Sequence, residues 1–324
     1  MTSTSPMHEQ IGIRHLQEPH LAEADRVFRL AFGTFIGIPD PSRFGGDADY
    51  VRSRWIADPS AALAAFEGEK LIGSNFAENW GSFGYFGPLT VDPAYWDKRV
   101  AQQLLGPTMD IFRRWRNTHL GLFTFPHSPK HMALYQKFGF WPRDLVALMN
   151  REISGWQDDV GADVARFSAT PPENKPAFLA DCRGISERNF SGLDLSHQID
   201  AVDRQKLGDT IMISRGSQAS AFAVCHTGPG SEAGSGVCYV KFAAVRPDAH
   251  ADDALSALVR AVRDFAASRG ATKVTAGVNL ARREAFRCMV NLGFRTAMQG
   301  VAMESGDSFA GYNRAGVYIL DDWR

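Results

Sequence analysis

Apolar residues recur along this chain in two alternating patterns, which predict a mixture of strands and helices. Residues 11–17 alternate as a strand does, whereas Leu21, Ala24, Val27 and Phe28 recur at helical spacing. The first half is predicted to contain, in order, a strand at 11–17, helices at 18–33 and 47–59, three strands within 61–93, a helix at 97–116, a strand at 120–126, a helix at 128–138 and a strand at 144–152. We therefore expect an α/β fold built on a mixed sheet (α+β).

The second half repeats this order. Its patterns predict helices at 173–190 and 195–208, strands at 209–215, 218–227 and 236–247, a helix at 252–270, a strand at 272–279, a helix at 281–294 and a strand at 295–304. Within this half the Gly/Ser-rich segment 226–236, "HTGPGSEAGSG", is predicted to be a mobile hairpin loop.

The two halves share an ungapped register of 154 residues. The stretch "YQKFGF" (Tyr135 to Phe140) matches "MVNLGF" (Met289 to Phe294), with Gly139 and Gly293 in equivalent places. Val91 and Val245 keep the same spacing, as do Leu104 and Leu258. A spacing this long indicates a duplicated domain, because solenoid repeats are about 20–50 residues long. We expect domains at 9–153 and 160–324, joined by a connector at 154–163.

Composition narrows the classes of partner. The chain has 324 residues, of which 44% are hydrophobic and 22% charged, and its formal net charge is −1. Because no basic block occurs, nucleic acid and anionic membranes are not expected as partners. Neither a secretory signal nor a membrane span is expected, and the four scattered cysteines suit buried free thiols in a reducing cytoplasm. No metal site is expected, and the sequence leaves open whether the protein forms an oligomer.

The stretch "HMALYQKFGF" (131–140) poses the question of function. A helix C-cap, in which Gly139 turns left-handed and Phe140 packs back, accounts for its last residues. That cap does not account for Tyr135. The stretch resembles the Leu-Tyr-x-Lys-x-Gly-Phe signature of the GNAT acyltransferase superfamily, and the order of elements resembles that family's in both halves. The chain is thus similar to a tandem GNAT protein.

The resemblance implies an acyl-CoA site in the first half. The family's Val-x-Pro strand leads into an (Arg/Gln)-x-x-Gly-x-(Gly/Ala) loop, and "LTVDPAYWDKRVAQQLL" matches this pattern in register. The loop and the helix start that would hold the pyrophosphate of acetyl-CoA, or of another acyl-CoA, are Trp96, Asp97, Lys98, Arg99, Val100 and Ala101. Backbone groups near Leu89, Thr90 and Val91 would bind pantetheine, where Phe86–Pro88 would interrupt the strand. We also expect Ser128 to contact the cofactor.

The loop departs from the pattern at two positions. Trp96 replaces the first basic or amide residue, and Arg99 replaces the first glycine, which makes the loop's shape harder to adopt. The positive charges of Lys98 and Arg99 would offset part of the resulting loss in phosphate binding. Pro107 should kink the following helix or mark a late start.

In the second half, acidic Asp252 and Asp253 stand at the helix start and Met289 takes the place of Tyr135. We expect a degenerate partner domain that kept the fold and lost the chemistry.

The resemblance makes Tyr135 the general acid for the leaving thiolate, since its ordinary pKa of about 10 permits that transfer. The alternative is a tyrosine that only packs in the core. Glu78, on the strand before the Val-x-Pro strand, is the candidate base, with a solvated carboxylate as the alternative. His127 and His131 titrate in a suitable range, although surface or capping roles suit both. The aromatic residues of "ENWGSFGYF" could line an acceptor pocket or fill the core.

These features predict an acyl-CoA-dependent N-acyltransferase, active in the first half, that acylates a primary amine of a small molecule by direct attack in a ternary complex. One alternative is a non-catalytic acyl-CoA or metabolite sensor, suggested by Trp96 and Arg99. The other is an acetyltransferase acting on a peptide or protein amine.

Overall fold

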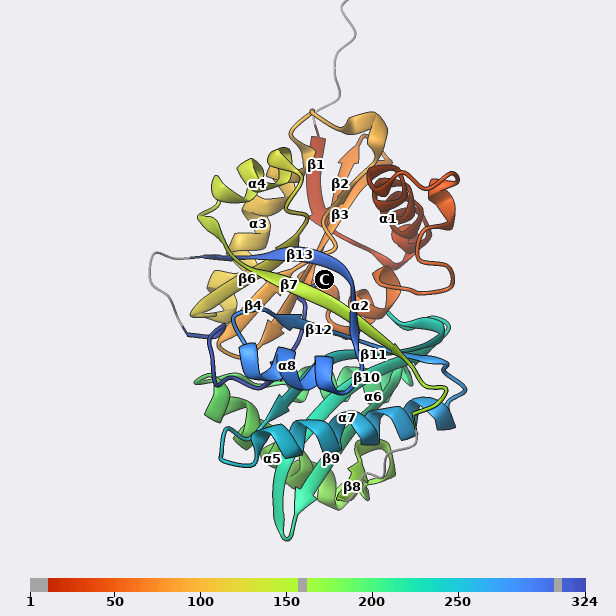
Figure 1. Cartoon of the computed structure of the whole chain (residues 1–324). Helices are drawn as coiled ribbons and strands as arrows, with labels where there is room; N and C mark the ends of the chain where they lie inside the picture. Colours follow the sequence, from red (N-terminus) through yellow and green to blue (C-terminus); the bar gives the residue numbers. More distant parts are fainter. Residues whose placement is uncertain (1–10, 157–161, 306–310) are drawn as a thin grey trace, which may run out of the picture. The chain divides into compact units, whose positions relative to one another are not determined.

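The computed structural model describes residues 11–156, 162–305 and 311–324 (Figure 1). The predicted domain starts at 9 and 160, and part of the connector at 154–163, lie outside these residues. The described residues form two compact units: those within 11–45, 50–77 and 88–114 make unit 1, and those within 46–49, 78–87, 115–156, 162–305 and 311–324 make unit 2. The predicted α/β class is confirmed. The units do not coincide with the two sequence halves, whose bounds stay a prediction.

Unit 1 is a small antiparallel sheet with helices packed on it. Its elements are β1 (Ile11–His15), α1 (Leu21–Ile36), α2 (Val51–Ala57), β2 (Ala62–Glu67), most of β3 (Lys70–Trp80), β5 (Thr90–Val91) and α3 (Val100–Trp115). The strand order is β1-β2-β3, with β5 paired to β3. The apolar face of α1 buries Val27 and Phe28 against Phe66 and Phe76 of the sheet. Helical spacing in 18–33 therefore predicted the buried face correctly.

Unit 2 is a larger mixed sheet covered by helices. Its strands are β4 (Phe83–Phe86), β6 (His119–Thr124), β7 (Phe140–Glu152), β8 (Asp163–Arg166), β9 (Gly208–Arg215), β10 (Gln218–Gly228), β11 (Gly234–Val245), β12 (Lys273–Asn279), β13 (Arg295–Ser305) and β14 (Ile319–Leu320). Its helices are α4 (Pro129–Gln136), α5 (Lys175–Asn189), α6 (Ser196–Gln205), α7 (Ala251–Ser268) and α8 (Arg283–Asn291). The strand order is β4-β6-β13-β7-β12-β11-β10-β9-β8, and β14 pairs with β11.

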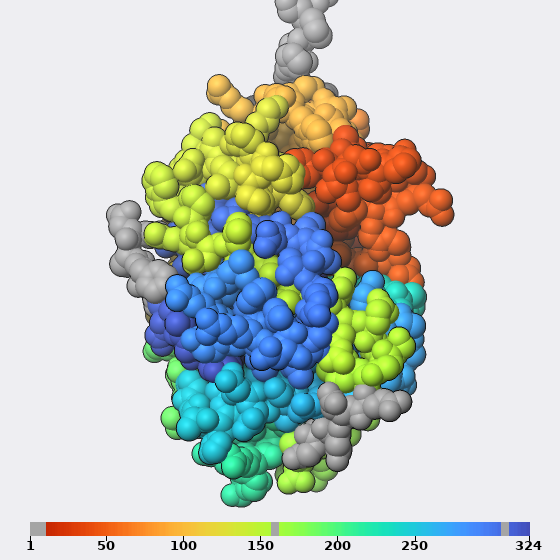
Figure 2. All heavy atoms as spheres, in the orientation of Figure 1, coloured from red at the N-terminus to blue at the C-terminus, as the bar shows by residue number. Residues whose placement is uncertain are grey.

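Two apolar cores lie on opposite faces of this sheet. Along β10, Ala223 and Cys225 belong to the core beneath α7 and α8, whereas Phe222 and Val224 belong to the core beneath α5 and α6. Figure 2 shows the residues of α7 and α8, in shades of blue, together on the outer face of this unit. Alternate side chains of one strand therefore serve both layers, as the pleat requires.

Strands β7 and β13, which are equivalent in the two sequence halves, are exchanged within unit 2. Strand β6 of the first half pairs with β13 of the second half, and β12 of the second half pairs with β7 of the first half (Figure 1). Strands β7 and β13 also pair with each other between them. Each half therefore completes the other half's sheet.

The 154-residue register holds element by element. Helix α7 begins three residues before the exact equivalent of the start of α3, and β12 begins at the exact equivalent of β6. Gly139 and Gly293 both adopt left-handed φ angles, of 82° and 84°. Leu104 and Leu258 are both fully buried. The duplication inferred from spacing is thus a structural one.

Some expectations about elements need correction. Four strands, rather than three, lie within 61–93, because β4 and β5 are separate, and β8 and β14 were not predicted. Helix α3 runs through Pro107 and does not start late. The segment 226–236 does connect two hairpin strands, but Ser231 and Glu232 at its centre are buried, with Glu232 bound to buried Lys241 at 2.7 Å.

Candidate active site

The chain between β4 and β5 leaves one ladder and joins another. β4 pairs with β6 from Phe83 to Tyr85 only. The predicted interruption at Phe86–Pro88 is confirmed: Gly87 has a φ of 150°, which side-chain-bearing residues rarely adopt, and Pro88 has no N–H to donate. Thr90 and Val91 then pair with β3. A Cβ on Gly73 of β3 would lie 2.7 Å from the Thr90 carbonyl oxygen, so only glycine permits this pairing.

A tight turn connects β5 to the loop before α3. The Asp92 Oδ1 atom accepts a hydrogen bond from the Ala94 backbone N–H at 3.0 Å, which caps a 3₁₀ turn over Pro93–Tyr95. The second oxygen of Asp92 accepts from Arg26 Nη2 at 3.2 Å. Asp92 is therefore a turn residue. The indole N–H of Trp96 donates to the Val91 carbonyl at 2.9 Å.

The loop keeps a glycine-like backbone without glycines. Asp97 has a φ of 65° and Arg99 a φ of 60°, and they are two of the five non-glycine residues with positive φ in the described part of the chain. An L-residue pays about 1–2 kcal/mol for this conformation. Asp97 and Arg99 therefore give the backbone two left-handed residues within the three positions that precede α3.

Cations gather beside this loop. Lys98 and Arg99 are exposed. The Lys98 Nζ atom lies 4.3 Å from the centroid of the Tyr95 ring, and Lys70 Nζ lies 5.0 Å from it. The Tyr95 hydroxyl donates to Glu67 Oε2 at 2.6 Å, and this hydrogen bond raises the pKa of Tyr95 to about 12. The start of α3 thus combines backbone N–H groups with two exposed positive charges.

The other predicted residues belong to unit 2. Tyr135, on α4, is 8% exposed, and it hydrogen-bonds with Thr124 of β6. Burial raises the pKa of Tyr135 to about 12. Its ring centroid lies 5.8 Å from that of Phe86 and 6.5 Å from that of His131. The phenol is therefore fully protonated at neutral pH, as a proton donor must be.

Ser128 and His131 mark the beginning of α4. The Ser128 hydroxyl accepts a hydrogen bond from the His131 backbone N–H at 3.4 Å, so Ser128 is the N-cap of this helix. Burial lowers the pKa of His131, and the neighbouring His127 and Lys130 lower it further. A lower pKa favours the neutral imidazole, which is the form that a base requires.

Glu78 and the nearby aromatic residues lie in the interior. Glu78 is 9% exposed on β3, so it is not the solvated carboxylate considered as the alternative. The Trp80 and Tyr85 rings are in edge contact at 4.7 Å between centroids, and Phe83 stacks on Tyr312 at 4.6 Å. Trp80, Phe83 and Tyr85 therefore fill a hydrophobic core rather than line an open pocket.

The second half has lost the equivalent groups. Asp252 and Asp253 occupy the first turn of α7, where carboxylates stabilise the helix dipole and repel a phosphate. Met289, in the place of Tyr135, is fully buried in the core. Val278 stands in the place of Thr124, so both members of that hydrogen bond are replaced by apolar side chains.

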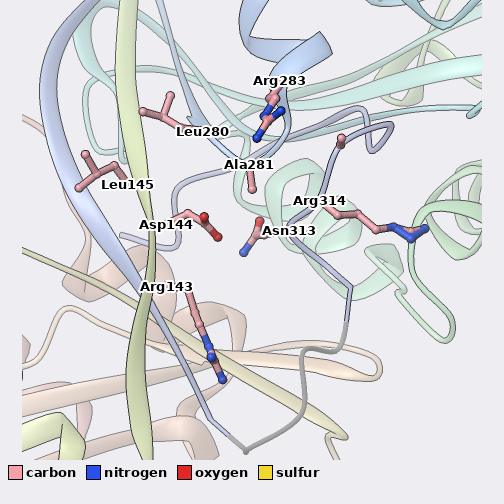
Figure 3. Close-up of a pocket in the computed structure, with 9 residues that line it drawn as sticks. Arg143, Asp144, Leu145, Leu280, Ala281, Arg283, Asn313 and Arg314 are labelled. Atoms are coloured by element: carbon pink, nitrogen blue, oxygen red, sulfur yellow. The ribbon is translucent and has the colours of Figure 1, made fainter.

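A separate pocket of about 590 Å³ opens on unit 2 and contains none of the predicted site residues. It lies between β7, the start of α8 and the segment before β14. In Figure 3 the side chains of Asp144 and Asn313 face one another across it, while Arg314 points away. Burial, with the nearby charge of Glu304, raises the pKa of Asp144.

Membrane-spanning helices and metal-binding clusters are both absent from the described residues. No helix among them is long and apolar enough to cross a membrane. Within the same residues, no group of three or more histidine, cysteine, aspartate or glutamate side chains could hold a metal ion.

Known proteins resemble this chain in fold. Residues 26–140 match the family described as acetyltransferase (GNAT) family. A Pyrococcus horikoshii structure, solved as a candidate acetyltransferase, has a TM-score of 0.68 at 13% identity, covering 98% of this chain and 96% of its own. A GCN5-related N-acetyltransferase from Sphaerobacter thermophilus has a TM-score of 0.57 at 13% identity, covering 95% and 99%.

A tandem GNAT protein from the clavulanic acid biosynthesis pathway has a TM-score of 0.57 at 11% identity, covering 93% of this chain and 100% of its own. A search of curated proteins gave no match. Identities this low establish the fold alone, and the family follows from the matched residues. Residues 26–140 thus form a domain of the acetyltransferase (GNAT) family, and the chain as a whole has the tandem GNAT fold.

Proposed function

We propose that this chain is an acyl-CoA-dependent N-acyltransferase, with acetyl-CoA as the first candidate donor and a primary amine of a small molecule as the acceptor. The observation that carries this proposal is the loop before α3. It holds Asp97 and Arg99 in left-handed conformations and places two cations, Lys98 and Arg99, at a helix start. Backbone strain of this kind persists where it serves a site.

The residues at this loop suit a diphosphate. The N–H groups of Val100, Ala101 and Gln102 have no acceptor within the helix, because they belong to its first turn. They would donate to phosphate oxygens, as N–H groups at helix starts do. Lys98 and Arg99 would neutralise the remaining charge. Thr90 and Val91, with Leu89, would bind the pantetheine through the backbone, and Ser128 remains a candidate contact.

The reaction would proceed by direct attack. The amine nitrogen forms a bond to the thioester carbonyl carbon, the carbon–sulfur bond breaks, and the departing sulfur takes a proton from the Tyr135 hydroxyl. A pKa of about 12 keeps this proton in place until a strong base forms beside it. A thiolate in a water-poor site is such a base, because burial raises its pKa as well. Glu78 or neutral His131 would accept the proton from the amine.

The second half has a supporting role in this proposal. We assign the catalytic domain to residues 9–153 and the degenerate one to 160–324, with β13 added to the sheet of the first and β7 to the sheet of the second. The near-zero net charge argues against nucleic-acid or anionic-membrane partners. The four buried free cysteines favour a reducing, cytoplasmic location.

A thiol-release assay tests the proposal. The protein with acetyl-CoA should release coenzyme A thiol only when an acceptor from a panel of small amines is added. The double variant Lys98→Glu/Arg99→Glu should weaken acetyl-CoA binding, whereas Arg113→Glu/Arg114→Glu, at the other end of the same helix, should not. Binding without thiol release would instead favour the sensor, and release only with peptide amines would favour the peptide acceptor.

A further inference from the structure

Most of residues 312–324 lie in the interior of unit 2, apart from an exposed turn at 314–316. Tyr312 and Ile319 are fully buried, and Asp322 and Trp323 are 1% and 3% exposed. The burial of this segment requires an explanation.

The segment lies where two parallel strands separate. β11 pairs with β12 as far as Val240 and no further. Beyond that point the end of β11 pairs with β14 instead, with Ala243 opposite Leu320 and Ala244 opposite Ile319. The Val245 N–H donates to the Tyr318 carbonyl at 3.0 Å. The segment thus takes the backbone hydrogen bonds that the separation of β11 from β12 leaves open.

The internal duplication shows what these positions correspond to. Ala243, Ala244 and Val245 are the 154-residue equivalents of Leu89, Thr90 and Val91, to which we assign pantetheine binding. The Tyr318 hydroxyl donates to Asp252 Oδ1 at 2.9 Å, and Asp252 is the equivalent of Lys98 beside the proposed pyrophosphate site. The segment therefore follows, in the second half, the path proposed for the coenzyme in the first.

Specific contacts hold the segment in place where β11 and β12 separate. Asp321 accepts hydrogen bonds from Arg282 Nη1 at 2.9 Å and from the Tyr312 hydroxyl at 2.5 Å. Asp322 accepts from the Tyr239 hydroxyl at 2.8 Å. All five of these carboxylate and donor groups belong to residues at most 2% exposed, so each pairing replaces lost hydration.

A glycine in β12 makes room for the segment. A Cβ on Gly277 would lie 2.3 Å from the Cβ of Asp322, a distance that two side chains cannot share. The equivalent residue in the first half is Phe123, a large side chain. The second half therefore carries a glycine at the point where the C-terminal segment crosses the strand.

We propose that residues 312–324 are the permanent occupant of the second half's cofactor groove, which closes that half to acyl-CoA. The identity of the groove rests on the function proposed for the first half. The partner that fits this groove is the chain's own C-terminus. It supplies the β-type hydrogen bonds of a pantetheine, and a tyrosine hydroxyl in place of a phosphate at the acidic start of α7.

A disulfide across the groove tests the proposal in the full-length protein. Ala244 and Ile319 face each other as a non-hydrogen-bonded pair, the closer of the two antiparallel pairings, so Ala244→Cys/Ile319→Cys should form a disulfide with oxidised glutathione. Each single variant is a control. The oxidised double variant should bind acetyl-CoA with the wild-type stoichiometry of one per chain, and with a Kd within about twofold of wild type.

Amide exchange gives an independent measurement. The Val245 amide should be protected in the wild type, and Gly277→Val should raise its exchange at least about tenfold by displacing the segment, with α4 unaffected. The matched change Gly12→Val, at a site with nothing within 4 Å of an added Cβ, should leave Val245 unchanged.

The outcomes separate the two proposals. Two acetyl-CoA molecules per wild-type chain and one in the oxidised variant would overturn the occupied groove, because the segment would have to leave. Failure of the disulfide to form, or an unprotected Val245 amide, would overturn it as well. If the wild type bound no acetyl-CoA, the function proposed for the first half would fail. A formed disulfide with a protected Val245 amide would then still support the segment as the groove's occupant.

Discussion

Replacing Arg99 with glycine should change stability and acetyl-CoA affinity in opposite directions. Arg99 is exposed and holds a φ of 60° immediately before α3. Glycine adopts this conformation without the clash of a Cβ atom, so Arg99→Gly relieves strain in the folded state. The same change removes a guanidinium that we assign to the coenzyme's diphosphate.

The magnitudes follow from these two effects. Left-handed backbone costs an L-residue about 1–2 kcal/mol. Glycine also makes the unfolded chain more flexible, which lowers the stability of the folded state by roughly 0.4–1 kcal/mol. The net gain is about 0.5–1 kcal/mol, a rise in Tm of roughly 1–3 °C for a protein of this size. Losing a hydrogen bond to a charged group costs about 1.5–3 kcal/mol, which weakens binding roughly 10- to 100-fold.

Arg116 provides a matched control. It is also an exposed arginine with a left-handed φ, of 58°, but it follows the end of α3 rather than preceding its start. Arg116→Gly should therefore raise Tm by a similar amount and leave acetyl-CoA affinity unchanged. Differential scanning fluorimetry and isothermal titration calorimetry measure the two quantities. Equal acetyl-CoA affinity in the Arg99→Gly variant and the wild type would refute the assignment of Arg99, and a lower Tm would refute the strain.

Three other predictions address the catalytic residues and the exchanged strands. Tyr135→Phe should keep acetyl-CoA affinity and lower kcat by roughly 10²–10⁴-fold, because the hydroxyl is needed as the thiolate leaves; turnover at the wild-type rate would remove Tyr135 from the mechanism. The pKa of His131 is lower in the folded protein than in the unfolded chain, so the unfolded chain is protonated first as the pH falls. The stability that neutral His131 contributes is therefore present above about pH 6.5 and is lost below it. Urea titrations of His131→Asn should show a smaller loss of stability on the acid side than the wild type, with His250→Asn as the control. A chain ending at Ile153 should aggregate, because β6 loses β13 and β7 loses both neighbours; a soluble, fully active monomer would contradict this reading of the exchange.

Much of the fold and part of the candidate site could be predicted from the chain's local patterns. Helical spacing located the buried face of α1, and the Gly-Phe pairs located two left-handed caps at Gly139 and Gly293. The signature around Tyr135 indicated the family, which the match over residues 26–140 bears out. These features depend on residues a few positions apart, so they can be predicted without knowledge of distant contacts.

Long-range pairing could not be read in the same way. Strands β7 and β13 occupy equivalent places in the repeat, so an alternating pattern in either suits β6 and β12 equally, and only the assembled sheet shows that they are exchanged. The left-handed backbone of Asp97 and Arg99 was hidden, because neither is the glycine that usually marks such a loop. The two-residue strand β14 carries too few positions to show a period, and its place on β11 depends on residues some 75 positions away. Pairing between distant segments is a property of the whole packed chain, whereas periodicity and capping are written into neighbouring residues.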